Sequence, residues 1–130
     1  MVSRFYKIFR WWPTIVVFIA ILWLTLAPHP LPDNDIRMFE GADKIVHAIM
    51  FGALTFAALF DISKWSLRLN LTTILSVCAG ILIFAFLDEA AQSYMNLGRT
   101  GDLYDFIADA LGILIVASGI FIFKKVYGIF

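Results

Sequence analysis

The sequence predicts an all-α integral membrane protein, a bundle of four transmembrane helices with both termini in the cytoplasm. Of its 130 residues, 62% are hydrophobic and only 15% are charged, so the chain is far more apolar than a soluble domain of this length. The mean hydropathy of +0.87 agrees. The chain also divides into four apolar runs, and its basic residues gather on one side of them.

The four helices are expected at about 11–27, 43–60, 69–95 and 103–124. Together they form a single transmembrane domain covering 1–130. The first run follows a basic start, as in a signal peptide, but no small-x-small cleavage site precedes Pro28, so we expect a retained helix. The second run has ionisable residues only at its start, and the third is uncharged up to Leu87. The fourth must carry Asp105 and Asp109 in its first turns to cross a hydrocarbon core of about 30 Å.

The basic residues predict how these helices are oriented. Because cytoplasmic loops are enriched in lysine and arginine, the more basic side is expected to face the cytoplasm. This side holds both termini, which predicts a multi-pass membrane protein whose two termini are cytoplasmic. The residues on that side are Arg4, Lys7, Arg10, Lys64, Arg68, Lys124 and Lys125, whereas Arg37, Lys44 and Arg99 lie on the other.

Composition also limits the partners. A formal net charge of zero gives no indication of a nucleic-acid partner. Because the chain is 62% hydrophobic, we expect membrane lipid as the partner. The single cysteine, Cys78, cannot form an intramolecular disulfide and lies in an apolar run, where a packing role is expected.

Ionisable residues concentrate where the apolar runs reach the outer side. Lys124 to Asp109 is 15 residues, or roughly 22 Å of helix, and Lys64 to His47 is 17 residues, or roughly 25 Å. Both side chains would then lie near the outer mouth of the bundle. Ionisable groups at membrane depth are costly and commonly mark a functional site. The candidate binding residues are Asp43, Lys44, His47, Glu89, Gln92, Arg99, Asp102, Asp105 and Asp109.

Helical spacing predicts which of these side chains share a face. Asp43 and His47 are four residues apart, as are Asp88 and Gln92. The aspartates of the fourth helix follow an i, i+3, i+7 pattern, which places them in a stripe along one face. Because charged side chains facing lipid are costly, this stripe should face the other helices. Its members are Asp102, Asp105 and Asp109, and Gly112 continues it beside the small residue Ala108. This small-xxx-small pair permits close helix approach.

Three fragments together resemble the VanZ-like family of small bacterial membrane proteins. They are Ala42-Asp43-Lys44-Ile45-Val46-His47, Asp88-Glu89-Ala90-Ala91-Gln92 and the run from Gly98 to Gly112. The resemblance spans about 22–116 and departs at Asp109, where the family pattern has asparagine. It implies a cell-envelope protein linked to glycopeptide or lipoglycopeptide susceptibility, teicoplanin resistance included, and supplies no established reaction.

Several readings of the polar residues remain open. They could serve only to link the helices structurally, although hydrogen bonds between transmembrane helices contribute on average only about 0.6 kcal/mol each. They could instead form an outward-facing pocket for a lipid-linked cell-wall precursor or the lipid-tailed drug, in which Arg99 grips a phosphate or carboxylate. A transporter or channel subunit would require several chains to assemble, since four helices are too few for a pore and no inverted repeat is visible.

An enzyme acting on a lipid-linked envelope substrate, such as a hydrolase or phosphatase, is the remaining alternative. Its candidate catalytic residues are Glu89, Asp105, Asp109 and His47, which could supply acid and base. No metal or other cofactor is firmly predicted. His47 with these carboxylates could hold a divalent ion, but one histidine and scattered carboxylates have no defining ligand spacing.

Overall fold

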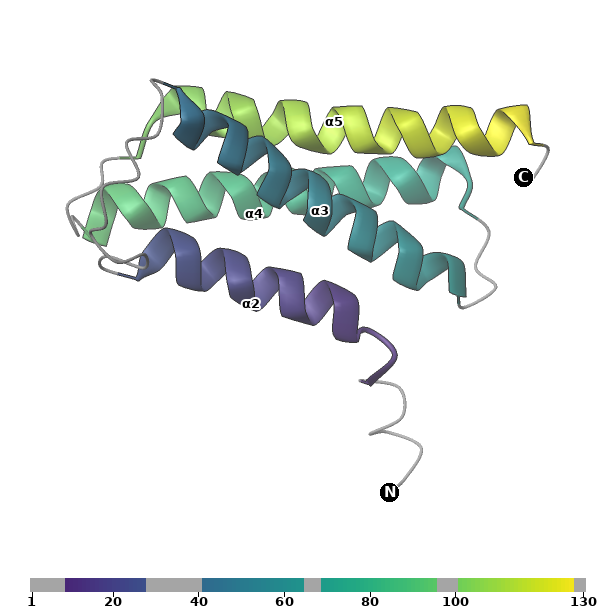
Figure 1. Cartoon of the computed structure of the whole chain (residues 1–130), viewed down its shortest axis with the longest axis horizontal. Coiled ribbons are helices and arrows are strands. Elements are labelled where there is room, and N and C mark those ends of the chain that lie inside the picture. The colour runs from purple at the N-terminus through teal and green to yellow at the C-terminus, as the bar shows by residue number, and fades with distance from the viewer. Residues whose placement is uncertain (1–8, 28–40, 65–68, 96–100, 128–130) are drawn as a thin grey trace.

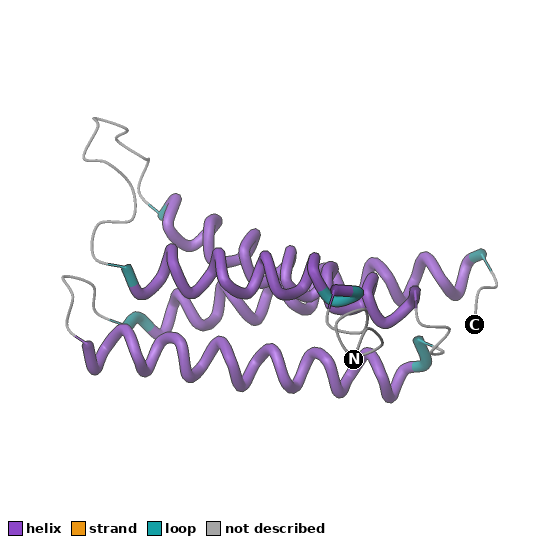
Figure 2. The backbone as a smooth tube through the Cα atoms, turned by 90° about the horizontal axis from the view of Figure 1, so that it is seen from below, coloured by secondary structure: helices purple, strands orange, loops and turns teal. Residues whose placement is uncertain are grey.

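The computed structural model describes residues 9–27, 41–64, 69–95 and 101–127. Within these ranges the chain forms four α-helices: α2 (Trp12–Leu26), α3 (Ala42–Lys64), α4 (Leu71–Met95) and α5 (Leu103–Val126). The helices lie lengthwise beside one another, with α3 crossing the bundle obliquely (Figure 1). Seen from below, the described part of the chain consists of helices and short connecting turns (Figure 2). The all-α prediction is confirmed.

Three of the helices, α3, α4 and α5, are long and apolar enough to cross a membrane. The first helix, α2, is also apolar but has 15 residues, which correspond to about 22 Å at 1.5 Å per residue. Pro13 stands in its first turn, where its missing N–H costs no intrahelical hydrogen bond.

Helix α3 ends at Lys64, later than the expected end at residue 60. The prediction assigned Asp61 to a loop because a charged residue follows the apolar run there. Asp61 is instead helical and fully buried, because its carboxylate accepts hydrogen bonds from the backbone N–H and hydroxyl of Thr14 in α2. A partner on a neighbouring helix therefore allows the helix to continue through a charged position.

Helix α3 packs against the other three helices, most extensively against α5, and is the most buried of the candidate spans. The core that it shares with its neighbours includes the fully buried side chains of Ile21, Phe51, Leu59 and Ile113. The Phe84 ring of α4 lies 5.6 Å from that of Phe51, a spacing typical of packed aromatic pairs. These contacts fix the helices that carry the polar residues.

Gly112 sets the closest approach of α5 to α3. A Cβ atom at this position would collide with the backbone carbonyl of Ala48, and one at Gly52 would lie 3.3 Å from the Gly112 carbonyl oxygen. Ala108, one turn earlier on α5, is buried as well. The small-residue stripe thus permits the close helix contact that its spacing predicted. Because His47 precedes Ala48 and Asp109 precedes Gly112 by one turn, this crossing also fixes the separation of His47 and Asp109.

Candidate functional site

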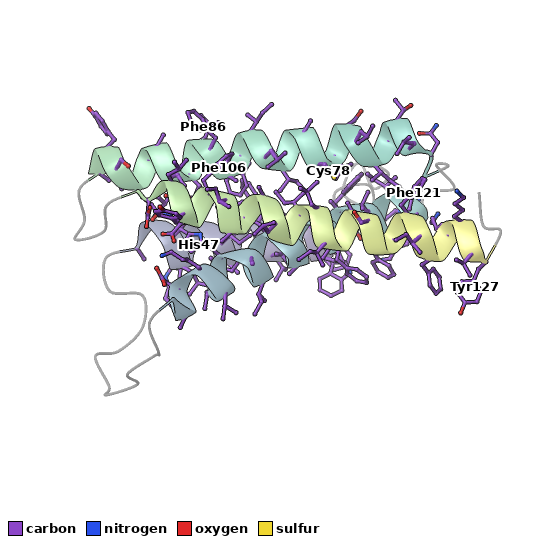
Figure 3. The ribbon with its side chains drawn as sticks, turned by 90° about the horizontal axis from the view of Figure 1, so that it is seen from above. His47, Cys78, Phe86, Phe106, Phe121 and Tyr127 are labelled. Carbon is purple, nitrogen blue, oxygen red and sulfur yellow. The ribbon has the colours of Figure 1, made fainter. Side chains whose placement is uncertain are left out.

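Three helices bring buried ionisable side chains together at one end of the bundle, which we call the polar end. Helix α3 supplies His47, α4 supplies Glu89, and α5 supplies Asp105 and Asp109. Figure 3 shows His47 at the end where Phe86 and Phe106 also lie, far from Tyr127. Exposure is 6% for His47, 7% for Glu89, 9% for Asp105 and 0% for Asp109. The inward orientation predicted for the aspartate stripe is therefore found at Asp105 and Asp109.

His47 lies between the three carboxylates. Its Nδ1 is 3.0 Å from Asp109 Oδ1, within hydrogen-bond distance, and 3.8 Å from Glu89 Oε1. Its Nε2 is 3.8 Å from Asp105 Oδ2. One imidazole therefore faces an acidic group on each side, and its two nitrogens face different carboxylates.

Several carboxylate oxygens of this cluster lack a hydrogen-bond partner among the residues that the structure describes. They are Glu89 Oε1, Asp109 Oδ2 and Asp105 Oδ1, the last of which has an ion-pair contact with Lys44 Nζ at 3.5 Å. Buried polar atoms are nearly always paired, so the oxygens of Glu89 and Asp109 require an explanation. The partner that would satisfy them is a hydrogen-bond donor or a cation.

The connection between α4 and α5 holds Glu89 in place. The backbone N–H of Asp102 donates to Glu89 Oε2 at 3.0 Å, while the Asp102 side chain accepts from the N–H of Tyr104 and caps α5. A Cβ at Gly101 would collide with Ser93 Oγ and lie 2.5 Å from the carbonyl oxygen of Glu89. Gly101 therefore allows the chain to approach the end of α4 closely enough for this hydrogen bond.

Lys44 and Asp43 lie at the rim of the cluster. Lys44 Nζ is 3.2 Å from Asp43 Oδ2, 3.5 Å from Asp105 Oδ1 and 3.7 Å from Asp102 Oδ2. The Asp43 side chain is 60% exposed, although it shares a helix face with buried His47. Exposed ion pairs of this kind contribute little to stability. Asp43 is therefore peripheral to the buried cluster.

Gln92 occupies a separate branch of the polar end, centred on Asp88. The Gln92 amide donates to Asp88 Oδ2 at 3.2 Å, as their spacing predicted, and the Thr25 hydroxyl lies 2.8 Å from Asp88 Oδ1. Sequence reasoning did not identify Thr25. The only signal was a hydroxyl residue inside an apolar run, and nothing in the sequence indicates that this part of α2 faces Asp88.

Arg99, the remaining candidate, lies outside the described residues. For the other candidates, the structure gathers His47, Glu89, Asp105 and Asp109 in the buried cluster, with Lys44, Asp43 and Asp102 around it and Gln92 beside it. His47, Glu89 and Asp109 each offer one possible metal-ligand atom, and these atoms lie within 4.8 Å of one another. The arrangement can bind a cation or a donor group, and the hydrogen-bonded His47 and Asp109 can exchange a proton.

The other end of the bundle holds a cavity of about 270 Å³ lined by Phe9, Arg10, Trp12 and Lys64. None of these residues belongs to the cluster around His47. Lys64 lies beside Asp61, 3.3 Å from its Oδ1. The two ends of the molecule therefore differ in both the sign and the pairing of their charges.

Comparison with known proteins identifies one family. A family model described as VanZ/LLP1 matches residues 4–125, which include α2, α3, α4, all but the last residue of α5 and the whole polar end. No curated protein and no solved structure matches the chain. Because the family match covers nearly the full length, the chain belongs to the VanZ/LLP1 family.

Proposed function

We propose that this VanZ/LLP1 protein is a cell-envelope protein of the bacterial cytoplasmic membrane that lowers susceptibility to teicoplanin-type lipoglycopeptides. It would do so by binding an envelope lipid or the drug at the polar end. The observation that carries the proposal is the set of unpaired carboxylate oxygens buried among three helices around His47. A cluster that served only to join helices would be expected to pair its own polar atoms.

The proposal includes a topology in which α2 joins the other three helices as a fourth span, both termini are cytoplasmic and the polar end faces outward. The basic residues of the terminal side support it. Tyr104 and Tyr127 provide a matched test, because both are 66% exposed and they lie at opposite ends of α5.

In a Cys78→Ala background, the substitution Tyr104→Cys should react with a membrane-impermeant maleimide added to whole cells. Tyr127→Cys should react only after the cells are opened. The reverse pattern would refute the outward orientation, and with it the access of an envelope ligand to the cluster.

Lys44 and Arg99 are two of the three basic residues on the proposed ligand side, and both are candidate binding residues. Lys44 is partly exposed beside the acidic cluster. An arginine can bind phosphate or carboxylate through two parallel hydrogen bonds, which suits a lipid-linked cell-wall precursor. The buried acids would then act on the donor groups, or the cation, that accompany such a ligand.

The direct test is teicoplanin susceptibility of a sensitive Gram-positive host that expresses the protein. Wild type should protect, while Glu89→Gln, Arg99→Ala and Asp105→Asn should return the host toward its original susceptibility. Membrane abundance is matched by immunoblot. Asp61→Asn is the control, because it replaces a buried aspartate of the same bundle outside the cluster. Full protection by the three variants would contradict the proposal.

The His47–Asp109 hydrogen bond favours a second candidate, a membrane-embedded hydrolase or phosphatase acting on a lipid-linked envelope substrate. His47 or Glu89 would act as acid or base. Purified protein should then release phosphate or a cleaved product from a lipid-linked pyrophosphate, and His47→Gln should abolish this turnover. Drug protection without turnover would favour binding alone.

A further inference from the structure

We propose that the polar end holds a divalent metal ion, with His47 Nδ1, Glu89 and Asp109 as its protein ligands. This proposal adds a ligand to the function proposed above, and it rests on that function only because both assign the binding site to the same cluster. It accounts for the buried carboxylate oxygens of Glu89 and Asp109 that have no hydrogen-bond partner among the described residues. Metal binding can be measured without reference to drug susceptibility, so the two proposals can fail separately.

The ligand separations suit a first-row metal. A zinc ion with bonds of about 2.0–2.2 Å to nitrogen and oxygen holds its ligand atoms about 3–4 Å apart. His47 Nδ1 lies 3.0 Å from Asp109 Oδ1 and 3.8 Å from Glu89 Oε1. One possible ligand atom from each of His47, Glu89 and Asp109 can be chosen so that all three atoms lie within 4.8 Å of one another. The three residues come from three helices whose packing fixes their positions.

The unpaired oxygens are the second, independent observation. Glu89 Oε1 and Asp109 Oδ2 belong to side chains that are at least nine-tenths buried, and neither has a hydrogen-bond partner among the described residues. Glu89 Oε1 lies 3.8 Å from His47 Nδ1, and the other Glu89 oxygen already accepts from the Asp102 N–H. A metal at this point would satisfy the carboxylate without any change in the helices.

Charge favours a cation with two positive charges. Glu89, Asp105 and Asp109 approach one imidazole, and Lys44 is the lysine beside them at the rim. Carboxylates crowded in a low-dielectric site repel one another, and a bound metal is a strong local source of positive charge. Mixed imidazole and carboxylate ligands suit zinc or manganese better than magnesium or calcium.

Asp105 is positioned to orient the histidine rather than to bind the metal. Its Oδ2 faces His47 Nε2 at 3.8 Å, on the side of the ring opposite Nδ1. Metal-binding histidines commonly donate their second ring N–H to a carboxylate, which fixes the tautomer. With the proton on Nε2 directed at Asp105, Nδ1 would offer its lone pair to the metal, which would take the place of the 3.0 Å hydrogen-bond contact between Nδ1 and Asp109 Oδ1. Three protein ligands also leave a coordination position open to a phosphate or carboxylate oxygen.

The experiment uses the full chain in detergent or nanodiscs, purified without a histidine tag and stripped with chelator. Zn²⁺ or Mn²⁺ is added, unbound metal is removed by gel filtration, and metal per chain is measured by mass spectrometry. Wild type should retain one ion per chain. Glu89→Gln, Asp109→Asn and His47→Gln should weaken binding more than Asp105→Asn, which should cost about tenfold, as expected for an outer partner.

Matched controls separate specific binding from general effects. Asp61→Asn removes a buried carboxylate at the other end of the bundle, and Cys78→Ala removes the thiol, so both should bind metal as wild type does. Gel-filtration profile and helical content show whether each variant is folded. Cobalt supplies a second readout, because the visible absorption of bound Co²⁺ should change when His47 is replaced.

Two results would overturn the proposal. One is the absence of bound metal from wild-type protein. The other is binding that Glu89→Gln and Asp109→Asn leave unchanged. If metal is absent but the cluster variants still lose drug protection, the proposed function stands without the metal.

Discussion

Two buried aspartates at opposite ends of the bundle, Asp61 and Asp109, have the same exposure of 0% but different partners. Asp61 Oδ2 accepts from the Thr14 backbone N–H at 3.1 Å and from its hydroxyl at 2.7 Å, while Oδ1 lies 3.3 Å from Lys64 Nζ. Asp109 Oδ1 pairs with His47, and its Oδ2 lacks a hydrogen-bond partner within the described ranges.

The difference indicates what each carboxylate contributes. A buried charge that is fully paired can stabilise the contact between two helices, whereas a buried polar group without a partner costs about 1–3 kcal/mol, and more when it is charged. Functional sites often retain such costs because activity requires them. We therefore interpret Asp61 as a structural link between α2 and α3, and Asp109 as part of a site that sacrifices stability for binding.

The largest expected loss of stability comes from disturbing the crossing of α3 and α5, which holds Asp109 next to His47. Gly112→Ala places a methyl group against the Ala48 backbone, which cannot move without separating α3 from α5. We expect a loss of about 1–3 kcal/mol, as for overpacked cores, together with weaker cluster function. Thermal unfolding in detergent measures the loss.

Gly119→Ala is the matched control on the same helix, because a Cβ there meets nothing within 4 Å. Alanine has the higher helix propensity by up to about 1 kcal/mol, so this variant should be as stable as wild type or slightly more so. Equal effects of the two substitutions would show that Gly112 does not set the α3–α5 distance.

A smaller loss of stability is expected from changes near Asp88. Both oxygens of its carboxylate have hydrogen-bond partners, as do those of Asp61. Thr25→Val removes the hydroxyl 2.8 Å from Asp88 Oδ1 and leaves the Gln92 amide on the other oxygen. The free energy of unfolding should fall by about 1 kcal/mol. Thr55→Val is the control, because within the described ranges that buried hydroxyl donates only to the Phe51 carbonyl of its own helix. If both variants lose the same stability, the Thr25–Asp88 contact contributes nothing specific.

The sequence predicted those parts of the site that depend on spacing within one helix. The period of the α-helix placed Asp105 and Asp109 on one inward face and joined Asp88 to Gln92. It could not predict contacts that depend on the rotation of one helix against another. Asp61 was therefore assigned to a loop, and its partner Thr14 was not identified.

The exposure of Asp43 shows the same limit. Its i, i+4 relation to His47 places both on one side of α3, but burial depends on how far the neighbouring helices extend. Asp43 stands in the first turn of α3 and is exposed, whereas His47 one turn later is covered. Spacing thus gives direction around a helix, and tertiary packing decides which turns are buried.

The most direct test of this account compares Glu89→Gln at the polar end with Asp61→Asn in the same two measurements: thermal stability of chelator-treated protein, and teicoplanin protection at matched membrane abundance. Glu89→Gln removes a buried charge while keeping an acceptor for the Asp102 N–H, so it should be at least as stable as wild type yet fail to protect. Asp61→Asn weakens the contacts to Thr14 and Lys64, so it should lose about 1 kcal/mol and still protect. If Glu89→Gln instead lost stability like Asp61→Asn and retained full protection, the polar end would be a structural link and the central claim would be wrong.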